Sequence, residues 1–220
     1  YFHRILARLI GLFFLIPLIF FYLSKKIKKE YINICYIILF LIILQGIIGW
    51  YMVVSGLNKD ITVSHYRLSL HLVNAILIIS MLFWLIKNFS TKKKRIFFKF
   101  SVKNLPFQIL IFLILIQIII GAFVSGLDAG RIYQTWPLMG YSYFPDDFSF
   151  TGFYSFFDFN NHSLVQFYHR NLAYFIIFYI VVLSIDILKK KLSYLYNPLK
   201  ILLFILSLQV ILGIYTLLSG

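Results

Sequence analysis

The chain has 220 residues, of which 61% are hydrophobic and 20% aromatic, and its formal net charge is +14. A soluble globular domain does not need so much apolar surface, so this composition excludes one. Several apolar runs exceed the roughly 18 residues that cross a bilayer. The sequence therefore predicts an all-α protein, a polytopic transmembrane helical bundle.

Six membrane-spanning helices are predicted in chain order. They cover about residues 5–23, 32–56, 68–86, 106–127, 168–188 and 198–220. Three connections between them, at residues 25–29, 87–103 and 189–200, hold 15 of the 21 basic residues. The positive-inside rule assigns these Lys-rich connections to the cytoplasmic or matrix side. Topology thus accounts for the positive charge, and we expect no nucleic-acid partner.

The outer connection from about residue 128 to residue 166 is long and rich in Tyr, Phe and Trp. Long connections in compact proteins are usually functional lids or disordered. Aromatic side chains favour the membrane interface, so we expect this segment to lie over the membrane surface. The single cysteine, Cys35, lies in an apolar run and excludes an internal disulfide.

One short motif occurs three times. A Gln-x-x-x-Gly pattern followed by Ser-Gly begins at Gln45, Gln117 and Gln209, and His-Arg pairs occur at residues 3–4 and 169–170. This internal repeat predicts two related half-bundles, residues 1–104 and 105–220. Glycine permits close helix approach and buried Gln bonds across helices, so packing is the favoured role of the motif. A cofactor-facing glycine is the alternative.

Three histidines, His3, His71 and His169, each stand near the start of an apolar run. At about 1.5 Å per residue they lie about 33, 24 and 30 Å from the next Lys-rich connection, which places all three in the outer leaflet. Ionisable groups are costly inside a bilayer and mark functional sites. Two facing helices with one histidine each can supply both axial ligands of a haem iron.

Arginines accompany these histidines. Arg4, Arg8, Arg67 and Arg170 each lie within about a turn and a half of one of them. A haem near the outer surface must have its propionates neutralised, and arginine does this bidentately. The alternative is that these arginines only reach toward lipid headgroups.

The two remaining histidines are weaker candidates. His65 is turned about 240° from His71 on a helix, and His162 follows two asparagines. We predict that both are residues of the outer connections rather than ligands.

Seven stretches carry a family resemblance: residues 1–11, 49–57, 64–72, 121–130, 136–139, 165–174 and 209–218, with motifs such as Phe2-His3-Arg4, Ser64-His65-Tyr66-Arg67 and Trp136-Pro137-Leu138-Met139. Together they resemble the haem A synthase family, the membrane enzymes that make haem A for cytochrome oxidase. Since the outer connections hold no cysteine, the resemblance is to the proteobacterial and mitochondrial branch.

The resemblance implies a fold and an activity. The family has eight helices in two halves, so this chain is expected to lack the first and the last. His3 and His71 in residues 1–104 would hold the substrate haem O, and His169 in residues 105–220 would hold a haem b cofactor. The implied reaction oxidises the C8 methyl group of haem O to a formyl group.

Two other classes of protein stay open from the residues alone. One is a di-haem membrane cytochrome b that transfers electrons without converting a substrate, and the other is a non-haem assembly or transport subunit with structural histidines. On the synthase interpretation the partners are haem O, haem O synthase, an unidentified electron donor and membrane lipid, with a homo-oligomer left open. The expected location is the bacterial inner membrane or the mitochondrial inner membrane, with the haem sites toward the outer side.

Overall fold

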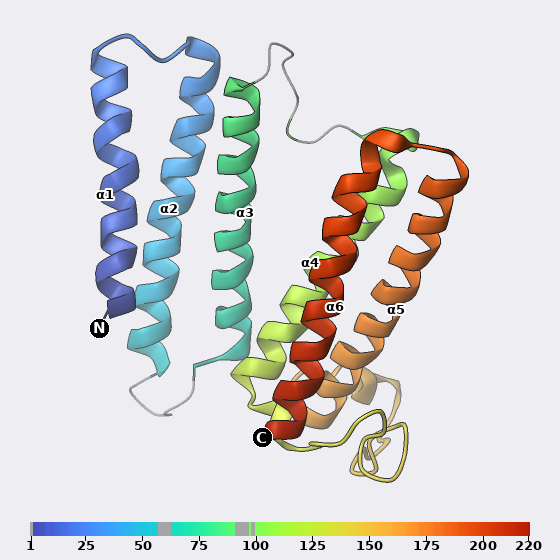
Figure 1. Ribbon diagram of the computed structural model, residues 1–220. Coiled ribbons are helices and arrows are strands. Elements are labelled where there is room, and N and C mark those ends of the chain that lie inside the picture. The colour runs from blue at the N-terminus through green and yellow to red at the C-terminus, as the bar shows by residue number, and fades with distance from the viewer. Residues whose placement is uncertain (1, 57–62, 91–96, 98–99) are drawn as a thin grey trace. The chain divides into compact units, whose positions relative to one another are not determined.

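The computed structural model describes residues 2–56, 63–90, 97 and 100–220. These residues form six helices that are long and apolar enough to cross a membrane. They are α1 (Phe2–Leu23), α2 (Lys29–Gly56), α3 (His65–Phe89), α4 (Leu105–Gly126), α5 (His162–Lys189) and α6 (Tyr196–Ser219) (Figure 1). The predicted all-α polytopic bundle is confirmed.

Some predicted features lie outside the described residues. They are Tyr1 of the first motif, Leu57, Lys59 and Asp60 after α2, and the basic residues 92–95 and 99 of the second Lys-rich connection.

All six of these helices begin earlier than hydropathy predicts, and two of the starts concern a histidine. α5 begins at His162 rather than near residue 168, because Asn161 caps it by accepting the Leu164 backbone N–H at 2.9 Å. α3 begins at His65 rather than near residue 68. The prediction that His65 and His162 lie in the outer connections was therefore wrong. Polar residues can form the first turn of a membrane helix, and an apolar-run criterion omits them.

The chain divides into two compact units, residues 1–99 and 100–220. In unit 1, α2 packs against both α1 and α3 (Figure 1). The buried apolar cluster of this unit lies in the half of each helix nearest the Lys-rich connections. Its members are Leu18, Tyr31, Cys35, Ile38, Leu41, Ile78, Met81 and Leu85. The opposite half, which we call the histidine end, contains His3 and His71.

Unit 2 has the same distribution. α5 packs against α4 and α6, and the apolar cluster again lies toward the Lys-rich end. Its buried members are Leu110, Ile176, Ile180, Leu183, Ile187 and Leu199. The histidine end of this unit is packed instead by residues 127–161, the outer loop, which folds back over the end of the helices (Figure 1).

The outer loop is held by aromatic stacking and a buried anchor. The Phe144 ring lies 4.9 Å from the Phe167 ring on α5, and the Phe148 and Phe156 rings lie 5.1 Å apart. Met139 is 1% exposed, and its backbone N–H donates to the Ser142 carbonyl at 2.8 Å. This loop is a packed part of unit 2.

Candidate functional site

In unit 1, the His71 ring packs directly on a glycine of the neighbouring helix. A Cβ atom built on Gly49 of α2 would lie only 3.1 Å from His71 Cε1 and 3.7 Å from Nδ1. One turn earlier on α2, Gln45 Nε2 donates to the His71 carbonyl at 3.0 Å. Any larger residue at position 49 would therefore push the ring out of this place by a few tenths of an ångström or more.

Unit 2 repeats this arrangement with different residues. A Cβ on Gly121 of α4 would lie 3.1 Å from His169 Cε1, and Gln117 Nε2 donates to the His169 carbonyl at 3.1 Å. We call each set of Gln, Gly and His a histidine cradle. In both cradles the glutamine bonds across helices, as expected for packing, and the glycine faces the ring of a candidate ligand.

The third copy of the motif, on α6, has no histidine beside it among the described residues. A Cβ on Gly213 would meet nothing within 4 Å.

The two cradles differ in how their glutamine is used. In unit 1, Gln45 Oε1 accepts a 2.7 Å hydrogen bond from Asn74 Nδ2. In unit 2, Gln117 Nε2 lies 3.2 Å from His169 Nδ1 and 3.3 Å from Nε2, so the amide contacts the imidazole itself. Within the described residues, His71 Nδ1 and Gln117 Oε1 are buried without a hydrogen-bond partner.

His3 belongs to the same unit as His71. It is exposed on the first turn of α1, at the same end of the unit as His71. The prediction that the two histidines of this half act on one haem stays a prediction. His169 stands in the other unit.

The arginines of unit 1 lie at its histidine end. Arg67 precedes His71 by one turn of α3, donates to Ser55 Oγ and places its guanidinium carbon 4.6 Å from the centre of the Tyr51 ring. Arg4 and Arg8 are exposed on α1. Their positions leave them accessible to an anionic group, which is what the propionate prediction requires.

Arg170 has a role that the sequence did not reveal. Its Nη1 donates to the carbonyls of Thr135 and Leu138 at 2.8 and 3.2 Å, and its Nη2 donates to the Tyr133 carbonyl at 2.7 Å. It therefore anchors the outer loop to α5, while Nε is buried without a partner among the described residues. No sequence signal marks this role, since every residue type carries a backbone carbonyl. The propionate role of Arg170 stays a prediction.

The other two histidines have different surroundings. His65 is 6% exposed, and its ring lies 4.0 Å from the Tyr66 ring. His162 is exposed at the start of α5. Neither forms a cradle.

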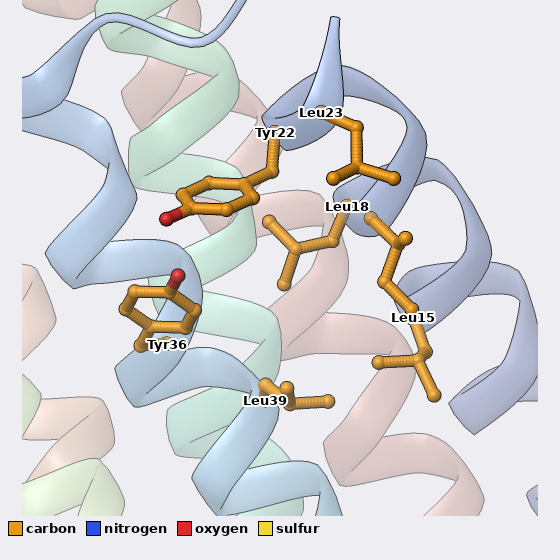
Figure 2. Close-up of a pocket in the computed structure, with 7 residues that line it drawn as sticks. Leu15, Leu18, Tyr22, Leu23, Tyr36 and Leu39 are labelled. Atoms are coloured by element: carbon orange, nitrogen blue, oxygen red, sulfur yellow. The ribbon is translucent and has the colours of Figure 1, made fainter. Parts of the chain in front are cut away.

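Unit 1 also contains an apolar cavity between α1 and α2 that is separate from the histidines. Figure 2 shows its lining, in which the Tyr22 and Tyr36 rings lie 6.5 Å apart. Its volume is about 120 Å³. A larger groove of about 400 Å³ shares Leu15 and Leu39 with it and extends along the two helices to Arg8.

Within the described residues, no three His, Cys, Asp or Glu side chains gather as a bare metal ion would require, whereas each cradled imidazole could serve as a haem ligand. A ligand imidazole that binds iron through Nε2 carries a proton on Nδ1 and is normally oriented by a hydrogen-bonding partner. A buried Nδ1 on His71 and a buried amide oxygen on Gln117 supply polar atoms at the two rings. Glycine at each ring removes the bulk that would displace it.

Six long apolar helices place the chain in the class of polytopic helical membrane proteins. The chain matches the cytochrome oxidase assembly protein family (COX15-CtaA) over residues 1–220, and it belongs to that family.

Three curated relatives, each named Heme A synthase, illustrate the similarity. The protein of Pelagibacter ubique is 45% identical over 100% of this chain and 64% of its own length. The protein of Wolbachia sp. subsp. Brugia malayi is 41% identical over 99% of this chain and 64% of its own length. The protein of Flavobacterium psychrophilum is 39% identical over 99% of this chain and 65% of its own length. The chain thus spans about 64% of the length of the first of these relatives. No solved structure matches it.

Proposed function

We propose that the full-length protein is a haem A synthase, which oxidises the C8 methyl group of haem O to a formyl group. The observation that carries the proposal is the repeated cradle: both units seat a histidine ring on a glycine, with Cβ–Cε1 separations of 3.1 Å, under a glutamine of the same helix. Relatives that bear the name Heme A synthase cover nearly the whole chain.

In this proposal the two units have different roles. His3 and His71 hold haem O as substrate in unit 1, and His169 is an axial ligand of haem b in unit 2. Their placement in separate compact units supports a division between substrate and cofactor.

The bound haems supply the redox chemistry, and the residues of the chain supply ligation, orientation and exclusion of water. Gly49 and Gln45 set the place of the His71 ring and of its backbone. Arg4, Arg8 and Arg67 provide positive charge for propionates at the same end. Arg170 fixes the outer loop over the first turns of α5, where it limits the access of water to His169.

The proposed setting follows from charge and lipid chemistry. The Lys-rich connections face the cytoplasm or matrix of a bacterial or mitochondrial inner membrane, and the histidine ends face the outer side. Haem O is lipophilic, so it can arrive through the membrane from a haem O synthase. An electron donor is also required.

The test is the extraction and chromatography of haems bound to the full-length protein, expressed with a supply of haem O. The proposal predicts haem b together with haem O or haem A. His169→Ala should remove haem b, because a low-spin iron loses one axial ligand. His71→Ala should retain haem b and stop formation of haem A.

The control is His162→Ala, an exposed histidine on the same helix as His169, which should leave both haems in place. Haem b alone, without conversion of haem O, would instead support a di-haem electron-transfer cytochrome. An unchanged low-spin spectrum in His169→Ala would remove the haem b assignment.

A further inference from the structure

The two cradles differ at one position of the histidine-bearing helix. The residue one turn after His71 is Asn74, which is 6% exposed. The residue one turn after His169 is Leu172, which packs against the apolar cluster of unit 2. Both lie on the same face of their helix as the histidine.

Asn74 fixes the glutamine of its cradle. Its Nδ2 donates to Gln45 Oε1 at 2.7 Å and to the Leu41 carbonyl at 3.1 Å. With its oxygen held in this way, Gln45 donates to the His71 backbone, and the His71 ring keeps a buried Nδ1 without a partner among the described residues.

Leu172 cannot hydrogen-bond, so Gln117 is not held in this way. Its Nε2 lies within 3.3 Å of both ring nitrogens of His169 as well as 3.1 Å from the His169 carbonyl. Its Oε1 is buried and has no partner in the described part of the chain. A half-turn of this unrestrained amide would bring the oxygen to the ring nitrogens, where it can accept a hydrogen bond from the ring N–H.

We propose that this position determines how firmly each cradle retains its haem. Asn74 holds Gln45 away from the His71 ring, so the glutamine does not hydrogen-bond that ligand. A site that must release its product requires such a weakly held ligand. Leu172 leaves Gln117 free to hydrogen-bond the His169 ring and fix its orientation, as a retained cofactor requires. This inference rests on the proposed haem ligation by His71 and His169, and it makes Gln45, Gln117 and Asn74 positioning residues.

The experiment exchanges the two residues in the full-length, haem-loaded protein. Asn74→Leu should slow the release of haem from unit 1 to an excess of haem-scavenging apoprotein, and Leu172→Asn should speed release from unit 2. Each change should be several-fold, up to about tenfold, which is the range expected for one net hydrogen bond. Extraction and chromatography distinguish the two haems.

A second measurement separates hydrogen bonding at the ligand imidazole from a change in the stability of the fold. The reduction potential and the low-spin electron paramagnetic resonance spectrum of haem b respond to hydrogen bonding at the ligand imidazole. Both should shift in Leu172→Asn. Leu172→Ala, which removes packing without adding an amide, should leave them close to wild type.

Matched controls guard against misfolding. Asn88 is a second buried asparagine on α3, whose Nδ2 donates to the Trp84 carbonyl at 3.1 Å far from His71. Asn88→Leu should not change either release rate. If Asn74→Leu does not accumulate, Asn74→Ala removes the same two hydrogen bonds without added bulk and should also slow release.

The outcomes separate this inference from the proposed function. Unchanged release rates and spectra in the exchanged variants would overturn the inference, while haem loss in His71→Ala and His169→Ala would still uphold haem ligation. Full haem content in both histidine variants would overturn haem ligation itself.

Discussion

Gly49 and Gly121 show how one missing side chain positions a ligand. A Cβ added to either glycine would lie 3.1 Å from Cε1 of the facing histidine, which is closer than ordinary van der Waals contact. A Cβ added to Gly46, one turn earlier on α2, would meet nothing within 4 Å. Gly46 and Gly49 are therefore chemically alike but differ in what they contact.

This difference predicts unequal effects of alanine. Gly49→Ala should displace the His71 ring, cost about 1–3 kcal/mol as overpacking does, and lower the content of the unit 1 haem several-fold. Haem extraction and thermal unfolding of the full-length protein measure both effects. Gly46→Ala is the control and should keep its haem, with stability equal or higher by about 0.5–1 kcal/mol from reduced backbone entropy. Equal haem loss in both variants would contradict the cradle.

Tyr133 makes the docking of the outer loop sensitive to alkaline pH. Its hydroxyl donates to Asp147 Oδ1 at 3.0 Å, and burial, followed by the hydrogen bond to Asp147, raises the pKa of Tyr133 above its ordinary value of 10.0. Asp147 Oδ2 also accepts from Ser163 Oγ of α5 at 2.5 Å. The protonated phenol thus holds the loop carboxylate that in turn binds α5.

The sign of the pH effect follows from the raised pKa. Below about pH 10 the phenol is protonated whether the loop is docked or released, so the docking stability is fully present. As pH rises through the pKa of the docked state, that contribution is lost. Hydrogen exchange of the loop at several pH values should show this loss in wild type. Tyr133→Phe should abolish this pH step, whereas Tyr154→Phe, at a tyrosine 89% exposed, should preserve it.

At the residue scale the sequence predicted some of the site and missed the rest. His71 and His169 are recognisable because an ionisable group within an apolar run is costly and needs a reason. Asn74 carries no such signal, because only the three-dimensional partner, Gln45, shows what it does. Arg170 was recognised as a charge, but its partners are backbone carbonyls, which every residue has.

At the scale of elements, hydropathy predicted six helices and missed how two of them begin. The amphipathic first turns of α3 and α5 carry His65, Arg67, His162 and Gln166, so the apolar runs start later than the helices. The outer loop was expected to lie over the membrane surface, and that placement stays a prediction. Its close packing on α5 depends on side-chain contacts, such as that of Phe144 with Phe167, that no periodicity encodes.

The anchoring of this loop can be tested at Arg170. Arg170→Lys replaces a planar fork that reaches three carbonyls with a single ammonium group. Loss of hydrogen bonds to a charged donor should destabilise docking by on the order of 2 kcal/mol. Limited proteolysis should then cut within residues 130–140 more rapidly. Arg131→Lys, at an exposed arginine of the same loop, should leave the cleavage rate unchanged.

At the scale of the whole molecule, each unit has a buried apolar cluster toward its Lys-rich end. Its cradle lies in the other half. Close-packed side chains there hold the helices together at a distance from the cradles, where the haems are proposed to bind.

The proposed orientation of unit 2 in the membrane can be measured by cysteine labelling. In a Cys35→Ser background, Tyr154→Cys of the outer loop should react with a membrane-impermeant maleimide in intact cells. Lys191→Cys, in the connection between α5 and α6, should react only after permeabilisation, because positive connections stay inside. Both positions are exposed in the structure. The reverse labelling pattern would invert the topology.

The cradles also bear on how the protein is made. Gln45 and His71 are 26 residues apart, and Gln117 and His169 are 52 apart, on helices that follow one another along the chain. Contacts of such short separation form early, since little chain must be ordered to close them. During synthesis into the membrane, the His71 ring can therefore be seated while unit 2 is still on the ribosome. With the proposed ligation, a haem could therefore meet the cradle of unit 1 before His169 has been translated.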